Sequence, residues 1–399
     1  MRWTAVIFCA VVAAGCARNA ESSLVPVVSS DGATVAPPVG VYRVLFSFNY
    51  ADGNFPTAGL IYYKGALYGT TASGGADSSG VFFKFAAGKE KTLYDFGSHS
   101  GDGLQPQFGP LIESGGVFYG TTYAGGAHSQ GTVFRITPAG AEKVIYSFKG
   151  ANDGANPEAG VIAVNGVLYG TTVSGGGNCS GNFCGTVFRV TTAGKETVLY
   201  RFKGGKDGIG PAGGLTYVKG KLYGTTNIGG AGGIGTVFEF SGTHEKVLHT
   251  FEGTFSKDGH GPTGNLTDVK GVLYGTTTYG GAYGSGSGTS GTVYAIATSG
   301  AYKVIYSFKG PDGGYPLYTT LVDVKGVLYG TTNLGGANNN GTVFAVTKAG
   351  GERVLHSFKG GKKDGAMPYG GPIPINGKLY GVASRGGTFN DGIIYVVTQ

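Results

Sequence analysis

The stretch Leu168–Thr172 reads LYGTT, and this phrase decides the fold because it recurs along the chain at a nearly fixed period. Exact or degraded copies place its tyrosine at Tyr68, Tyr119, Tyr169, Tyr223, Tyr274, Tyr329 and Tyr380. Successive tyrosines are 51, 50, 54, 51, 55 and 51 residues apart. A period near 50 residues is typical of propeller blades or of solenoid units.

Each repeat contains four strand-like segments in a fixed order. The third repeat reads VIAV (Val161–Val164), an Asn-Gly pair, VLYGTT, a Gly-rich loop, GTVFRV, a short Ala-Gly turn and TVLYRF. Two-residue Asn-Gly or Lys-Gly links are strong hairpin signals, so the segments predict a four-stranded antiparallel meander with VIAV innermost. A longer connection through Asp207-Gly208 and Pro211 follows the fourth segment. Such a connection predicts the step to the next blade.

Composition favours an all-β chain with an aromatic core. Glycine contributes 80 of 399 residues, charged residues make up 13%, and there are 25 Tyr and 23 Phe. No apolar period of 3.6 residues indicates a helix. Gly-rich chains can be disordered, but disordered chains lack aromatics, whereas here the aromatics recur with the repeat. We therefore expect one closed domain.

The two ends of the repeat region predict how the ring closes. The region begins with a lone fourth-type strand, Tyr42–Phe48, and stops after a third-type strand, Ile393–Val397. The amino-terminal strand therefore supplies the missing outer strand of the last blade, which leaves no free sheet edge. We predict an all-β, seven-bladed β-propeller over residues 41–399, with four antiparallel strands per blade.

The amino terminus resembles an export signal. The apolar stretch Val6–Ala14 is too short to span a bilayer, and small residues directly precede Cys16. This ending resembles a bacterial lipobox, so we expect residues 1–15 to be a signal peptide, Cys16 to be lipidated, and residues 16–40 to form a tether. The protein would then be an extracytoplasmic lipoprotein at the outer membrane or cell surface. Cleavage after Ala17 is the alternative and would give a secreted protein.

Cysteine usage agrees with export. Once the signal is removed and Cys16 is lipidated, Cys179 and Cys184 remain, in one Gly/Asn/Ser-rich loop. In an oxidising compartment we expect a disulfide between them. Their loop contains no His and no further Cys, so it is a poor zinc site.

The repeat phrases resemble those of known families. Gly-Gly after the second strand, as at Gly125-Gly126, together with the third and fourth strands, resembles kelch repeats in order and period. LYGTT, GG, GTVF, YSF and DG together are more similar to the GloVer-type choice-of-anchor tandem repeats of bacterial surface proteins, over Tyr42 to Gln399. This resemblance implies export, attachment to the cell surface and no established catalytic residues. The last repeat departs from it, because Val382-Ala383 replace the Thr pair.

Loop lengths point to one face of the propeller, formed by the second-to-third loops and the blade-crossing connections. Two second-to-third loops are long, Gly177–Cys184 and Ala282–Ser290. Extra loops on one face often form a binding surface, although surface loops also tolerate insertions at little entropic cost. The candidate ligand-face residues are His99, Asp102, His128, Asn178, Tyr283, Arg385 and Asp391.

Seven Asp-Gly pairs are expected on the same face. Asp before Gly suits a tight turn, because its side chain caps backbone groups, whereas a ring of carboxylates binding cations is the alternative. No D-x-D-x-D series of a calcium loop occurs. His99, Asp102 and His128 could converge where the first two blades meet and form a metal or acid-base site. The sequence otherwise predicts no metal site and no cofactor.

Function is less well determined than the fold. The net charge of +7 indicates modest affinity for anionic partners, but because export separates the protein from nucleic acid, we expect no nucleic-acid partner. No G-x-S-x-G, H-E-x-x-H or Walker sequence occurs. We expect a monomeric, non-catalytic binding module, anchored to a membrane by its lipid, for an envelope protein or a glycan. The alternatives are a glycan-processing hydrolase or lyase on the loop-rich face and a structural scaffold.

The lipobox hypothesis predicts the behaviour of one variant. Cys16→Ser removes the only sulfur available at the expected attachment site, so it should abolish palmitate labelling and release the domain from membranes. Metabolic labelling followed by membrane fractionation measures both effects. Labelling that persists in the variant would contradict the hypothesis.

Overall fold

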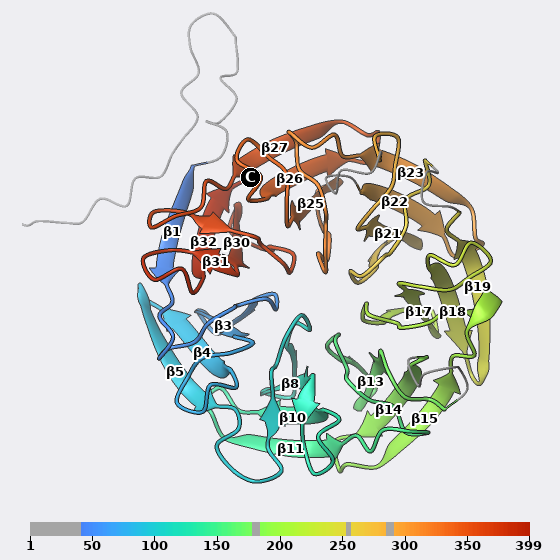
Figure 1. Cartoon of the computed structure of the whole chain (residues 1–399), viewed down its shortest axis with the longest axis horizontal. Helices are drawn as coiled ribbons and strands as arrows, with labels where there is room; N and C mark the ends of the chain where they lie inside the picture. Colours follow the sequence, from blue (N-terminus) through green and yellow to red (C-terminus); the bar gives the residue numbers. More distant parts are fainter. Residues whose placement is uncertain (1–40, 178–183, 253–256, 285–290) are drawn as a thin grey trace, which may run out of the picture. The chain divides into compact units, whose positions relative to one another are not determined.

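The structure of the protein is a computed structural model that describes residues 41–177, 184–252, 257–284 and 291–399. The predictions for residues 1–40, including Cys16, lie outside this range. The described residues form a ring of seven four-stranded antiparallel sheets, shown in Figure 1. They contain no α-helix, and one 3₁₀ turn occurs at Gly205–Asp207. The predicted fold class is confirmed.

Six blades are continuous in sequence and run from the innermost to the outermost strand. They consist of β2 (Ile61–Tyr63), β3 (Ala66–Thr70), β4 (Val81–Ala86) and β5 (Lys89–Asp95); β7 (Ile112–Ser114), β8 (Val117–Thr122), β10 (Thr132–Ile136) and β11 (Glu142–Ser147); β12 (Ile162–Val164), β13 (Val167–Thr172), β14 (Thr186–Thr191) and β15 (Glu196–Arg201); β16 (Thr216–Val218), β17 (Lys221–Thr226), β18 (Thr236–Ser241) and β19 (His244–Thr250); β20 (Thr267–Val269), β21 (Val272–Thr277), β22 (Thr292–Ala297) and β23 (Tyr302–Ser307); and β24 (Val322–Val324), β25 (Val327–Thr332), β26 (Thr342–Thr347) and β27 (Glu352–Ser357).

The seventh blade joins the two ends of the propeller. Its strands are β29 (Ile373–Ile375), β30 (Lys378–Ala383), β32 (Ile393–Thr398) and, outermost, β1 (Tyr42–Ser47). β1 pairs antiparallel with β32, from Tyr42 opposite Val397 to Ser47 opposite Ile393. The predicted closure by the amino-terminal strand is therefore confirmed.

The glycine of the LYGTT phrase makes room for an aromatic ring of the third strand. Gly170 pairs with Phe188, and a Cβ on Gly170 would lie 2.6 Å from the Phe188 ring. The same ring packs edge-to-face with Phe148 of the preceding blade, with centroids 5.0 Å apart. The same aromatic pair occurs at the other six junctions, at Phe48–Phe83, Phe96–Phe134, Phe202–Phe238, Phe251–Tyr294, Phe308–Phe344 and Phe358–Tyr395. Aromatic packing thus connects every blade to the next.

The two threonines of the phrase have different partners. The second, Thr172, shares a hydrogen bond of 2.8 Å with Thr186 of the third strand of its own blade. The first, Thr171, donates to the carbonyl oxygen of Gly213 in the next blade. In the last blade Ala383 pairs with Ile393, so an apolar contact replaces the Thr–Thr hydrogen bond. This contact accounts for Ala383 in place of the second threonine of the phrase.

One face of the propeller carries the connections after the second and fourth strands, such as residues 123–131 and 148–161. We call it the loop-rich face. Its two kinds of connection are bridged in all seven blades, in two cases as short strand pairs: β6 (Gly103–Leu104) with β9 (Ala124–Gly125), and β28 (Gly365–Ala366) with β31 (Arg385–Gly386). The predicted placement of the Asp-Gly segments beside the second-to-third loops is confirmed.

Removing β1 should open the ring. Deletion of residues 41–48 exposes the edge of β32 and removes Phe48, a fully buried residue that packs on Phe83. The loss of such a side chain alone costs about 3–5 kcal/mol. The variant should therefore melt at a lower temperature and aggregate, as calorimetry and light scattering would show. A protein lacking only residues 1–40 is the control, and equal melting of the two proteins would refute this closure.

Candidate functional site

The seven recurrent aspartates cap the backbone where each outer strand ends. Lys149 N–H, for example, donates to Asp153 at 2.7 Å. The equivalent backbone amides bond Asp52, Asp102, Asp207, Asp258, Asp312 and Asp364 at 2.6–3.2 Å. The turn-cap interpretation is confirmed. These carboxylates have a structural role in every blade.

Outer-strand side chains add a second hydrogen bond to most of these aspartates. Tyr146 Oη donates to Asp153 at 2.8 Å, and Tyr94, Tyr200 and Tyr306 contact their aspartates in the same way. His249 and His356 replace the tyrosine in two blades and contact Asp258 and Asp364. Each of these histidines also stacks on a tyrosine of the following outer strand, Tyr302 or Tyr42. Both are therefore part of blade packing.

Where the following outer strand does not carry a tyrosine, it brings a glutamate close to the aspartate. Burial, and then the charge of Asp153, raise the pKa of Glu196 to about 7. The same two causes raise the pKa values of Glu90, Glu142 and Glu352 to about 7 and that of Glu245 to about 8. Five junctions between blades therefore hold an acid pair that favours one bound proton near neutral pH.

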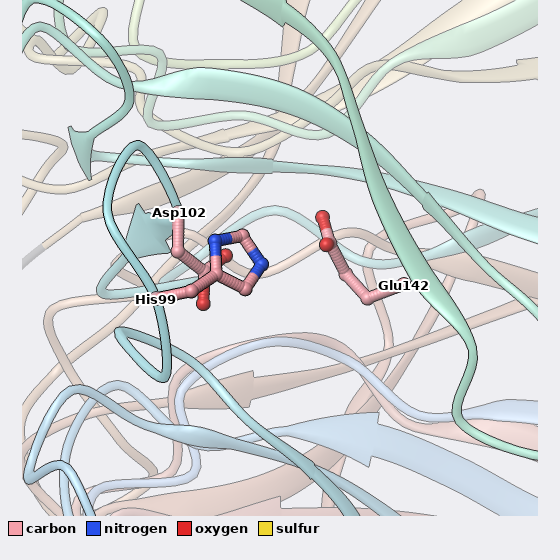
Figure 2. A group of neighbouring side chains, drawn as sticks. All are labelled: His99, Asp102 and Glu142. Atoms are coloured by element: carbon pink, nitrogen blue, oxygen red, sulfur yellow. The ribbon is translucent and has the colours of Figure 1, made fainter.

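The first two blades meet at an acid pair that also includes a histidine. The candidate ligand atoms of His99, Asp102 and Glu142 all lie within 4.8 Å of one another. Figure 2 shows Glu142 reaching towards the imidazole of His99, which lies beside Asp102. The predicted convergence of His99 and Asp102 is confirmed, but the third member is Glu142 and not His128. His128 is exposed in the loop before β10 and is not in this group.

The other predicted ligand-face residues are dispersed. The Arg385 guanidinium lies 4.3 Å from the centre of the Phe55 ring, and the carbonyl oxygen of Asp391 accepts a hydrogen bond from Phe55 N–H. Tyr283 is 56% exposed, with the Lys309 ammonium 5.6 Å from its ring centre. Asn178 and Cys179, and most of both long loops, lie outside the described residues. Cys184 is buried and disulfide-bonded.

A second cluster, which the sequence did not predict, lies on the propeller axis. Each blade places one residue four positions before its inner strand, at the loop-rich end of that strand. We call these seven residues the channel mouth: Thr57, Phe108, Glu158, Ala212, Thr263, Tyr318 and Tyr369. Phe108 of the second blade stacks on Tyr318 of the sixth, with centroids 4.0 Å apart. These blades are not neighbours, so the contact crosses the axis.

The channel mouth combines three aromatic rings with one carboxyl group. Tyr369 lies 5.6 Å from Phe108, and Tyr318 Oη donates to Glu158 at 2.9 Å. Burial raises the pKa of Glu158, while the hydrogen bond from Tyr318 acts in the opposite direction. Glu158 is the only acid among the seven mouth residues. The mouth is therefore asymmetric in a ring whose other recurrent positions are nearly uniform.

Local backbone geometry brings the two stacked rings together. Phe108 and Tyr318 have φ values of 60° and 54°, which non-glycine residues rarely adopt. Five residues separate Pro106 from the inner strand in the second blade and Pro316 from the inner strand in the sixth, whereas four separate Pro56 from the inner strand in the first. This extra residue is the signal in the sequence that an alignment of the seven repeats could have revealed.

Two hollows along the inner strands have sizes suited to small ligand groups. One, of about 200 Å³, lies against Phe108 and Tyr318 and is lined by Leu60, Pro110 and Thr320 among others. The other, of about 520 Å³, is lined by Ala163, Tyr217 and Asn265. Small-molecule sites are commonly concave, apolar and furnished with a few polar groups. The channel mouth and the smaller hollow are both mostly apolar and contain a few polar groups.

Comparisons with known proteins bear on family and fold. A model of the Gloeobacter/Verrucomicrobia repeat matches residues 33–184, 181–289 and 279–399, whereas no curated protein matches the chain. The chain is similar to the structure of a putative 6-phosphogluconolactonase from Bacteroides uniformis, with 16% identity, a TM-score of 0.50, and 80% of this chain and 88% of that chain covered.

A second similar structure is that of puromycin hydrolase, with 9% identity and a TM-score of 0.51. The match covers 84% of this chain and 51% of that one, so the chain spans about half the length of that enzyme. Identities this low show a shared propeller fold alone. Among the described residues, no helix is long and apolar enough to cross a membrane.

The acid pairs predict a dependence of stability on pH. A raised native pKa means that the folded state binds the proton more tightly, so its stabilising effect is present at low pH and is lost as pH rises towards 7. Glu196→Gln mimics the protonated acid. Relative to the parent it should be little changed at pH 5 and stabilised by about 1 kcal/mol at pH 8, a value reduced for solvent screening. Urea unfolding at both pH values tests this, and an equal difference at pH 5 and 8 would refute it.

Proposed function

The chain belongs to the family of Gloeobacter/Verrucomicrobia repeat proteins, and we propose that it acts as an exported, non-catalytic binding module held at the cell surface. The amino-terminal signal and the expected lipid on Cys16 support export and anchoring. The channel mouth on the loop-rich face supports ligand binding. Anchoring rests on the amino-terminal sequence and ligand binding rests on the mouth residues, so each part of the proposal can be tested separately.

The observation that carries the binding role is the concentration of repeat-breaking residues at the axis. The recurrent aspartates are occupied by hydrogen bonds that hold the blades together, as at Asp153. The mouth, in contrast, varies from blade to blade and brings Phe108, Glu158, Tyr318 and Tyr369 into contact. A scaffold has no need for such asymmetry, whereas a specific ligand does.

A glycan is the ligand class that suits this chemistry best. Aromatic faces beside hydroxyl and carboxyl groups offer an apolar surface together with a few oriented hydrogen-bonding groups. The Glu158 carboxyl and the Tyr318 hydroxyl provide both acceptor and donor capacity. Exposed aromatics elsewhere on the same face, including Tyr279 and Phe389, extend the apolar surface. An envelope protein remains the other partner that binding experiments should distinguish.

A glycan-processing enzyme is the second candidate, and it has one observation in its favour. The raised pKa of Glu158 suits a general acid. Most glycosidases, however, use two carboxyl groups on either side of the scissile bond. The mouth supplies one, so the geometry supports binding better than hydrolysis.

Variants at the mouth test the proposed function. On a glycan array, Phe108→Ala should weaken capture of the preferred glycan roughly tenfold, which is about 1.4 kcal/mol, because one face of the aromatic cluster is lost. Tyr50→Ala is the control, since Tyr50 is an exposed tyrosine of the loop-rich face outside the mouth. Equal affinity of the Phe108 variant and the parent would exclude the mouth as the site.

The same proteins separate binding from catalysis. The parent should bind the preferred glycan without cleaving it, as chromatography of the glycan after incubation would show. Cleavage by the parent that disappears in Glu158→Gln would instead establish the enzymatic alternative.

A further inference from the structure

From the juxtaposition of His99, Asp102 and Glu142, we propose that the junction of the first two blades is a divalent-cation site, with Zn²⁺ as its best-suited ion. The site is distinct from the channel mouth and does not depend on the proposed function. His99 and Asp102 follow β5 of the first blade, and Glu142 begins β11 of the second. A bound ion would therefore link two neighbouring blades.

The three side chains can converge on one ion after small movements. Their candidate ligand atoms lie within 4.8 Å of one another, and ligands of a tetrahedral Zn²⁺ at about 2.0–2.2 Å are roughly 3.5 Å apart. His99 is exposed, so its ring can turn without disturbing the core. Glu142 Oε1 is buried and has no hydrogen-bond partner, as is also true of the equivalent oxygens of Glu196, Glu245 and Glu352, but only Glu142 is grouped with a histidine among the described residues. A cation would supply the interaction that Glu142 Oε1 lacks.

Hydrogen bonds already orient the Asp102 carboxylate. Asp102 Oδ2 accepts from Tyr94 Oη and from the N–H groups of Gly97 and Ser98, whereas Oδ1 accepts only from Gly103 N–H. Tyr94 Oη lies 3.3 Å from His99 Nε2, 2.7 Å from Asp102 Oδ2 and 3.5 Å from Glu142 Oε2, so Asp102 presents Oδ2 towards the other two side chains. Such hydrogen bonds around the ligands fix their orientation in many metal sites.

The surroundings of His99 favour the tautomer that a metal requires. His99 Nδ1 lies 3.3 Å from the carbonyl oxygen of Ser100, which can only accept, so a hydrogen bond between them places the proton on Nδ1. Nε2 lies 3.3 Å from Tyr94 Oη, but the tyrosine proton is directed to Asp102 at the shorter distance of 2.7 Å. In this tautomer Nε2 has the lone pair that a metal requires.

The ligand types select among metals. One imidazole nitrogen and carboxylate oxygens suit Zn²⁺ and similar transition metals, whereas Ca²⁺ takes six to eight oxygens. Four other junctions pair an aspartate with a glutamate but show no histidine within such a group among the described residues. They provide internal controls within the same chain.

Zinc titration of the metal-free full-length protein tests the proposal. Calorimetry should show one Zn²⁺ bound per chain, and Zn²⁺ should raise the melting temperature because it binds only the folded junction. His99→Ala and Glu142→Gln should each weaken binding at least tenfold. Glu196→Gln, the matched change at the next junction, should leave the affinity within twofold of the parent.

Several outcomes would overturn the assignment. Absence of Zn²⁺ binding by the parent would do so, and so would equal affinity of the parent and either His99→Ala or Glu142→Gln. Since His99 is exposed, its variant should melt like the parent in the absence of zinc, which separates loss of the ion from loss of the fold. Binding that survives in His99→Ala would instead belong to another histidine, such as His249 or His356.

Discussion

The packing of an aromatic ring over a glycine is the contact on which the rest of this propeller depends. In the third blade the Phe188 ring contacts Gly170 of its own blade and packs edge-to-face with Phe148 of the previous blade. Any side chain at Gly170 would push the ring away, because even a Cβ would be 2.6 Å from it. The glycine therefore sets how closely neighbouring blades approach. Its recurrence in all seven repeats gives the junctions the regularity that ring closure needs.

Residues that recur in every repeat have structural roles in this chain, whereas the candidate functional residues differ between repeats. Asp153 and its six equivalents resemble a ring of catalytic or cation-binding carboxylates, yet each accepts backbone hydrogen bonds that terminate an outer strand. The positions that differ between repeats carry the candidate chemistry, as Glu158 and Tyr318 show at the mouth. His99 shows the same at a junction, where it adds a nitrogen ligand to an acid pair that other blades also possess. In a repeat protein, departures from the consensus are thus the better guide to function.

The sequence predicted the architecture well because its signals are local. Strand order followed from hairpin links such as Asn165-Gly166, and closure followed from the strand types at the two ends, Tyr42–Phe48 and Ile393–Val397. The turn role of the Asp-Gly pairs was likewise a local inference. Each blade has four strands, so the connections after the second and fourth strands lie at the same end of the sheet. The sequence therefore also predicted that these loops share one face.

The sites could not be predicted in the same way, because their members meet only when the ring closes. Glu158 and Tyr318 are 160 positions apart in sequence and touch across the axis. Glu142 occupies a position that looks solvent-facing in an outer strand, and its contact with His99 depends on the angle between two blades. The choice of His128 as third member was therefore wrong.

Backbone strain at the channel mouth indicates that its two stacked aromatic side chains are held in place by the fold. In all seven blades the residue before the proline that follows the Asp-Gly or equivalent pair has a positive φ, as Asn156 does, so that conformation belongs to the fold. Phe108 and Tyr318 adopt positive φ in addition, and only in the two blades with the longer segment. Such conformations cost about 1–3 kcal/mol each and persist where the surrounding structure fixes them. The rigid ring supplies that support and holds the two rings stacked in advance, so a ligand would not bear the entropic cost of ordering them.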